Sequence, residues 1–121
     1  MRDPHTIMVL AGEVSGDLLG AELIRELKTL SPSLTSFGMG GPRMQEAGVR
    51  LSEDATRLSV VGFLEVLKRL PAFRALFHSL LEEAKREKPD AVVLIDNPGF
   101  NLRFAKTIRP HVPKIAYYVS P

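Results

Sequence analysis

The sequence predicts an α/β domain in which a Rossmann-like parallel sheet carries helices on both faces. Apolar runs typical of buried strands alternate with amphipathic helical patterns, which indicates parallel strands joined by helices. The runs at 7–10 and 91–95 contain no polar alternation, as expected for strands covered on both sides. A glycine-bearing loop at 12–16 joins the first strand to the first helix, which is the ligand-binding corner of such sheets.

Local patterns place each element. The expected strands occupy residues 7–10, 34–37, 49–51, 91–95 and 115–119. The expected helices occupy residues 16–30, 42–47, 71–88 and 102–109. Ser15 suits the N-cap of the first helix, and Asp17 in its first turn favours the positive end of the helix dipole. Pro42 suits a first helical position after the glycine turn 38–42, and Asn101 is expected to cap the last helix.

Residues 58–70 are strongly apolar but do not fit one helix face. One interpretation is core packing, the usual fate of apolar residues. The other is an exposed apolar and basic surface, with Lys68 and Arg69, that contacts a membrane or a lipid substrate. The residues of this second interpretation, called the apolar patch below, are Phe63, Leu64, Val66, Leu67 and Leu70.

The composition is that of an ordinary globular domain. The 121 residues are 45% hydrophobic and 25% charged, which suffices for one modest core, so residues 1–121 form one domain or part of a larger one. A net charge of +2 without a Lys/Arg block argues against nucleic acid as a partner. The chain has no cysteine, no room for a signal peptide before the first strand, and no apolar run near the ~20 residues of a membrane helix. We therefore expect a cytoplasmic protein.

Two motifs and one metal pattern are missing. Gly12, Gly16 and Gly20 stand at every fourth position, so they form no G-x-G-x-x-G fingerprint, and no Gly-Lys-Ser/Thr follows a glycine loop. The loop is therefore not expected to bind NAD or a nucleoside triphosphate. The three histidines lack metal-ligand spacing, so neither a metal nor a cofactor is expected.

Asp96 is the strongest candidate for a catalytic residue. It follows five apolar residues at the carboxyl end of a parallel strand, where a carboxylate can act as a general base. Asn97-Pro98-Gly99 is also typical of a turn, so a turn-forming role is the alternative. Glu13, Ser15 and Asp17 are expected to border the same crevice, although Glu13 and Asp17 fit a solvated charge and a dipole residue equally well. Tyr117 and Tyr118 alternate across the last strand, where one of them could approach the crevice or pack in the core.

Five segments together resemble the lipid-A-disaccharide synthase family. They are AGEVSGDLLGA at 11–21, GMGGPRM at 38–44, VGFLEVL at 61–67, IDNPGFN at 95–101 and YYVSP at 117–121. Gly99 departs from the family pattern, which usually has a second aspartate there. The resemblance covers essentially the whole chain. It implies that residues 1–121 are the acceptor-side, amino-terminal part of a glycosyltransferase-B fold, whose active site lies between two Rossmann-like halves.

The resemblance also implies an activity. The family joins the sugar of UDP-2,3-diacylglucosamine to the 6-hydroxyl of 2,3-diacylglucosamine 1-phosphate with inversion, and releases UDP. Asp96 would be the general base, with Ser15 as a second catalytic residue. The residues expected to bind the acceptor are Gly12, Glu13, Gly16, Asp17, Gly40, Gly41 and Asn101.

Because both substrates carry acyl chains and reside in a membrane, the resemblance implies that the apolar patch contacts the cytoplasmic face of the inner membrane. The donor would be held mostly by a half not seen here, so the 121 residues alone are expected to be inactive. The alternatives are a non-catalytic flavodoxin-like binding domain and, less favoured, an oxidoreductase with a nucleotide cofactor.

Overall fold

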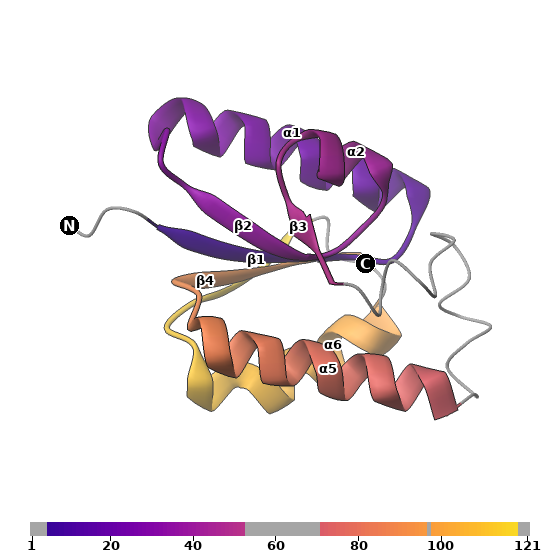
Figure 1. The fold of residues 1–121 in the computed structure, drawn as a ribbon. Helices are drawn as coiled ribbons and strands as arrows, with labels where there is room; N and C mark the ends of the chain where they lie inside the picture. The colour runs from indigo at the N-terminus through magenta and orange to yellow at the C-terminus, as the bar shows by residue number, and fades with distance from the viewer. Residues whose placement is uncertain (1–4, 53–70, 97, 119–121) are drawn as a thin grey trace.

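The computed structural model describes residues 5–52, 71–96 and 98–118. Five parallel strands form one sheet in the order β3-β2-β1-β4-β5. They are β1 (Thr6–Ala11), β2 (Thr35–Met39), β3 (Arg50–Leu51), β4 (Ala91–Ile95) and β5 (Ile115–Tyr118). The helices are α1 (Val14–Leu30), α2 (Pro42–Glu46), α5 (Pro71–Glu87), α6 (Pro98–Ile108) and the short η1 (Arg109–His111). Figure 1 shows α1 and α2 on one face of the sheet and α5 and α6 on the other, which confirms the predicted fold class.

The residues of β1 alternate between two apolar layers. Met8 and Leu10 belong to the layer between the sheet and helices α5 and α6, whereas Val9 and Ala11 belong to the layer beneath α1 and α2. All four are at most 1% exposed, and β4 repeats the pattern. Burial on both faces explains why these two strands show no polar alternation.

Strand β2 continues two residues beyond its predicted end. Gly38 and Met39, predicted to begin a turn, pair instead with Val9 and Leu10 of β1. Gly38 has a φ of +146°, and a Cβ atom at this position would overlap the carbonyl oxygen of Val9. Glycine is therefore required here by the close approach of two strands, and its presence does not end the strand.

Two predicted helix caps are wrong. Helix α1 begins at Val14, so its N-cap is Glu13, which makes no side-chain capping bond, and Ser15 lies exposed in the first turn. Helix α6 begins at Pro98, four residues before its predicted start, so Asn101 lies inside it. The fixed φ of a proline suits a first helical position, which explains the earlier start of α6.

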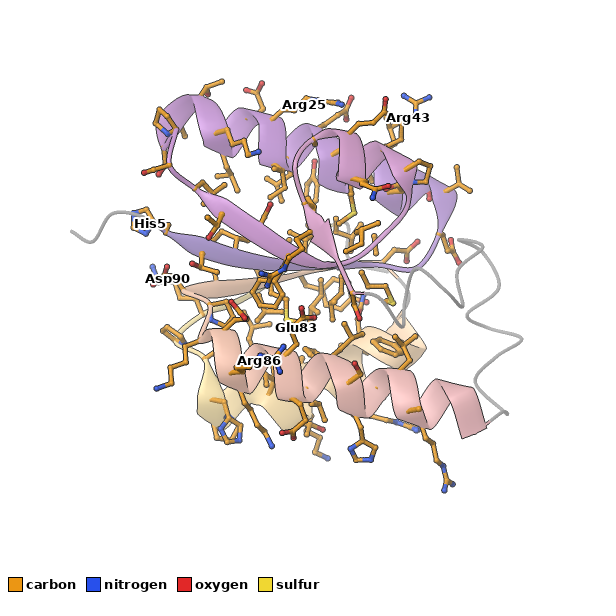
Figure 2. The ribbon with its side chains drawn as sticks, in the orientation of Figure 1. His5, Arg25, Arg43, Glu83, Arg86 and Asp90 are labelled. Carbon is orange, nitrogen blue, oxygen red and sulfur yellow. The ribbon has the colours of Figure 1, made fainter. Side chains whose placement is uncertain are left out.

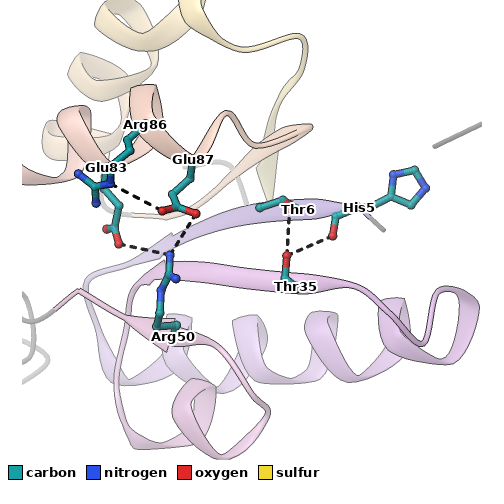
Figure 3. Close-up of polar contacts among 7 residues, drawn as sticks. All are labelled: His5, Thr6, Thr35, Arg50, Glu83, Arg86 and Glu87. Atoms are coloured by element: carbon teal, nitrogen blue, oxygen red, sulfur yellow. Dashed lines mark hydrogen bonds and ion pairs between the residues drawn. The ribbon is translucent and has the colours of Figure 1, made fainter. Parts of the chain in front are cut away.

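The edge strand β3 is joined to helix α5 by an ion-pair cluster (Figure 3). The guanidinium of Arg50 lies 3.7 Å from Glu83 and 3.5 Å from Glu87, and it stacks over the Phe37 ring at 5.5 Å. Glu83 Oε1 is buried without a hydrogen-bond partner among the described residues. Burial raises the pKa of Glu83 above its ordinary 4.5, and the charges of Arg50 and Arg86 oppose this effect only in part.

The raised pKa predicts a dependence of stability on pH. Folded Glu83 holds its proton more tightly than unfolded Glu83, so the free energy of unfolding falls as pH rises from about 4.5 through the folded pKa. The substitution Glu83→Gln should remove this decrease, as measured by urea unfolding at several pH values. Glu82→Gln, which changes an exposed carboxylate of the same helix, is the control and should leave the pH profile unchanged. A Glu83→Gln profile as steep as that of the unsubstituted protein contradicts this account.

Candidate functional site

The carboxyl ends of β1, β2 and β4 meet at one edge of the sheet, called the carboxyl edge below. Ala11 pairs with Ile95 and Leu10 pairs with Met39. The 12–16 loop, the 40–41 glycine pair and Asp96 therefore leave the sheet side by side, as the sequence predicted. Helices α1 and α6 begin at this edge on opposite faces of the sheet. The site is thus bordered by two glycine segments, by the N-termini of α1, α2 and α6, and by the carboxylates of Glu13 and Asp96.

Asp96 combines a strained main chain with a carboxylate to which no described residue donates a hydrogen bond. Its φ is +50°, a left-handed conformation that costs a non-glycine residue about 1–2 kcal/mol. Its main-chain carbonyl oxygen accepts hydrogen bonds from Asn101 Nδ2 at 2.8 Å and from the Tyr117 hydroxyl at 2.6 Å. Among the described residues, none donates a hydrogen bond to its half-buried carboxylate. Strain of this kind is concentrated at functional sites.

Asn101 lies fully buried behind Asp96. Its Nδ2 donates hydrogen bonds to the carbonyl oxygens of Ile95, at 3.2 Å, and Asp96. Because both neighbours are acceptors, the nitrogen of the amide must face them. Asn101 Oδ1 is then left buried without a partner among the described residues. Asn101 thus holds the end of β4 through its Nδ2 atom, while its Oδ1 atom remains an acceptor.

Asp17 holds the second glycine segment in place. Its carboxylate is 3% exposed and accepts hydrogen bonds from the main-chain N–H groups of Gly41 at 2.8 Å, Arg43 at 3.0 Å and Met44 at 2.9 Å. These are N-terminal amides of α2, so Asp17 caps α2 in addition to lying in the first turn of its own helix, as predicted. Its enclosure in protein contacts makes it a support for the site.

The first glycine loop brings α1 close to the strand ends. A Cβ atom on Gly16 would lie 3.2 Å from Ala11 Cβ and 3.4 Å from Ile95 Cγ2, so glycine permits this close packing. Gly12 is also buried, whereas Glu13 is half-buried and Ser15 is exposed. Glu13 and Ser15 are therefore the polar side chains of this loop that solvent and ligands can reach, beside the exposed apolar Val14.

The role of Tyr117 was missed by sequence reasoning, which left core packing and approach to the crevice open. Its ring packs against the core layer of α5 and α6, while its hydroxyl reaches the Asp96 carbonyl. Burial raises the pKa of Tyr117 above 10.0, and the negative charge of Asp96 raises it further. The neighbouring Tyr118 is 39% exposed. The alternation of the last strand was the available signal, but the partner depends on β5 lying next to β4.

The remaining features bear less directly on the carboxyl edge. The apolar patch falls in residues that the structure does not describe. Within the described ranges no group of three or more His, Asp or Glu residues could hold a metal ion, and no helix is long and apolar enough to cross a membrane. A cavity of about 400 Å³ lies at the β2–β3 side, lined in part by Thr6, Thr35 and Arg50, and has no lining residue at the carboxyl edge.

Comparison with known proteins agrees with the resemblance of the five segments. Residues 7–121 match the family described as Lipid-A-disaccharide synthetase. The lipid-A-disaccharide synthase of Myxococcus xanthus is 47% identical over 121 residues, which is 100% of this chain and 32% of the relative. That of Geobacter sulfurreducens is 46% identical over 117 residues, 97% of this chain and 30% of the relative. That of Coxiella burnetii (strain Dugway 5J108-111) is 48% identical over 116 residues, 96% of this chain and 31% of the relative.

The chain spans about a third of the length of these curated relatives, while nearly all of its own length takes part in each match. The match includes the glycine loop, the 40–41 glycine pair and Asp96, which together form the carboxyl edge. The chain therefore belongs to the Lipid-A-disaccharide synthetase family.

Proposed function

We propose that this chain supplies the acceptor-binding side of a glycosyltransferase that makes the lipid A disaccharide. The observation that carries the proposal is Asp96, a carboxylate without hydrogen-bond donors among the described residues, beside a glycine loop at the carboxyl edge. The relatives' name supports the reaction. The acceptor would be 2,3-diacylglucosamine 1-phosphate and the donor UDP-2,3-diacylglucosamine.

In this proposal Asp96 acts as the general base. Its carboxylate takes the proton of the acceptor 6-hydroxyl while that oxygen forms a bond to the anomeric carbon of the donor. The bond from that carbon to the UDP oxygen breaks, and UDP leaves with the bonding electron pair. Attack from the face opposite the leaving group inverts the anomeric configuration. No metal is needed for the proton transfer, because the carboxylate alone can accept it.

The surrounding residues would hold the acceptor. Ser15 and Glu13 are accessible at the start of α1, where a hydroxyl and a carboxylate can bond sugar hydroxyls. Gly12, Gly16 and Gly40 would offer main-chain groups to the ligand, and Asn101 Oδ1 would offer a buried acceptor. Asp17 contributes indirectly by fixing Gly41. The positive ends of the α1 and α6 dipoles favour the anionic groups that both substrates carry.

The test uses a full-length chimera, in which residues 1–121 replace the segment of the Myxococcus xanthus relative to which they align. We expect the chimera to release UDP from the two lipid substrates, with the unmodified relative as the reference. The 121-residue chain alone should release none, because the donor half of a glycosyltransferase-B fold is proposed to lie outside it. A folded chimera that binds both substrates but releases no UDP would favour a non-catalytic binding domain.

We also propose that the protein works at the cytoplasmic face of the inner membrane. Both substrates carry acyl chains, and exposed apolar residues occupy the first two turns of the helices at the carboxyl edge: Val14 is 72%, Leu18 41% and Leu102 55% exposed. Together with the apolar patch, these residues would contact lipid.

Vesicle binding tests the membrane proposal. The combined substitutions Phe63→Ser, Leu64→Ser and Leu67→Ser should weaken binding to phosphatidylglycerol vesicles while leaving thermal stability nearly unchanged. Leu30→Ser is the matched control, because Leu30 is 82% exposed at the far end of α1. A stability loss of about 2–5 kcal/mol for the patch variant would instead assign these residues to the core.

A further inference from the structure

We propose that Tyr117, together with Asn101, is a positioning residue for Asp96. The two side chains bind the main-chain carbonyl of Asp96 and thereby fix the direction in which its carboxylate projects. The inference rests on the proposed role of Asp96 as a base. It also assigns a role to Tyr117, which belongs to the 117–121 segment, a segment that the proposed function does not otherwise use.

Two side chains bind the same atom, the main-chain carbonyl oxygen of Asp96. Asn101 approaches it from α6 at 2.8 Å and Tyr117 approaches it from β5 at 2.6 Å. Asp96 has a φ of +50°, a left-handed conformation that aspartate adopts more often than most residues but still at a cost. A return to an ordinary φ would reorient the peptide group that follows Asp96 and move its oxygen away from at least one donor. The two hydrogen bonds therefore offset the strain and select one orientation of the residue.

Tyr117 suits this role because its ring is fixed and its hydroxyl stays protonated. The ring packs against the core layer of α5 and α6, and the paired register of β5 with β4 sets Tyr117 opposite Leu94. The raised pKa of the phenol keeps the hydroxyl a donor throughout the neutral range. Tyr118, on the next position of the same strand, is 39% exposed and provides a natural comparison.

The activity test uses the full-length chimera. Tyr117→Phe removes only the hydroxyl, and it should lower kcat about 10–100-fold while the KM for the acceptor changes less than about twofold, because misplacing a reacting group by ~1 Å can cost ~10²-fold. Tyr118→Phe should change neither parameter. In an Asp96→Asn background, Tyr117→Phe should have no further effect, because it acts through Asp96. Full kcat in Tyr117→Phe, or an equal loss in both backgrounds, overturns the proposal.

A second measurement does not depend on turnover. The 121-residue chain has two tyrosines, so in that chain Tyr118→Phe leaves Tyr117 as the only phenol, whose titration is followed by ultraviolet absorbance. Asp96→Asn in that background should lower the pKa of Tyr117 towards 10.0, because it removes a nearby negative charge. An unchanged pKa would mean that the groups are not neighbours and overturns the positioning role even in an active enzyme. A shifted pKa in the 121-residue chain, combined with a chimera that releases no UDP, would instead refute the proposed function and leave the contact intact.

Discussion

Asp96→Asn is expected to lower the turnover of the full-length chimera by about 10²–10⁴-fold, the usual contribution of a general base. Asparagine has no basic oxygen to take the proton of the acceptor hydroxyl. It nevertheless tolerates a left-handed main chain as well as aspartate does, so the φ of +50° and the two hydrogen bonds to the carbonyl should persist. The loss should appear in UDP release at saturating substrate, while acceptor binding measured by calorimetry remains.

Asp90→Asn is the matched control for this prediction. Asp90 precedes β4 as Asp96 follows it, so the same chemical change is made at the opposite end of one strand. There its carboxylate accepts a hydrogen bond from the Thr6 N–H at 2.8 Å and lies 3.8 Å from His5 Nδ1. Figure 2 labels the neighbouring side chains of His5 and Asp90. Turnover should stay near normal. If Asp96→Asn behaves in the same way with acceptor bound, Asp96 is a turn residue and the base lies elsewhere.

The sheet could be predicted because burial on both faces leaves an unmistakable pattern in the sequence. The runs that became β1 and β4 are apolar without interruption, and their ends are adjacent in any parallel pairing of the two strands. The shared edge of the glycine loop and Asp96 followed from this alone. The start of α6 was missed because Asn97-Pro98-Gly99 is typical of a turn. The end of β2 was missed because Gly38 also is, although there it permits contact with Val9.

The supporting contacts of the site could not be predicted because they join residues far apart in the sequence. Tyr117 reaches a carbonyl 21 residues earlier, and this depends on the order of the strands. Asp17 carried a local interpretation, a carboxylate at the start of its own helix. That interpretation is correct but incomplete, because a second helix start, 24–27 residues later, also lies within reach and has amides to satisfy. The residues were recognisable as candidates, but their partners were not.

Among the substitutions discussed for this protein, removal of the Asp17 carboxylate is expected to lower the free energy of unfolding the most. Asp17→Ala leaves three main-chain N–H groups of α2 without their acceptor, and two of these bonds are buried. An unsatisfied buried donor costs about 1–3 kcal/mol, so the free energy of unfolding should fall by about 3 kcal/mol or more. Urea unfolding of the 121-residue protein measures this loss. Glu22→Ala, which removes an exposed carboxylate from the same helix, should change stability by less than about 0.5 kcal/mol.

Asp17→Asn separates the hydrogen bonds from simple loss of volume. Oδ1 accepts from Gly41 and Met44, so the single oxygen of asparagine can keep both bonds, while its NH₂ group faces the N–H of Arg43. The loss of stability should therefore lie between those of Asp17→Ala and Glu22→Ala. Equal losses for the alanine and asparagine variants would show that the negative charge at the start of α2 dominates. A negligible loss for both would mean that water satisfies the amides, and that Asp17 does not hold the second glycine segment.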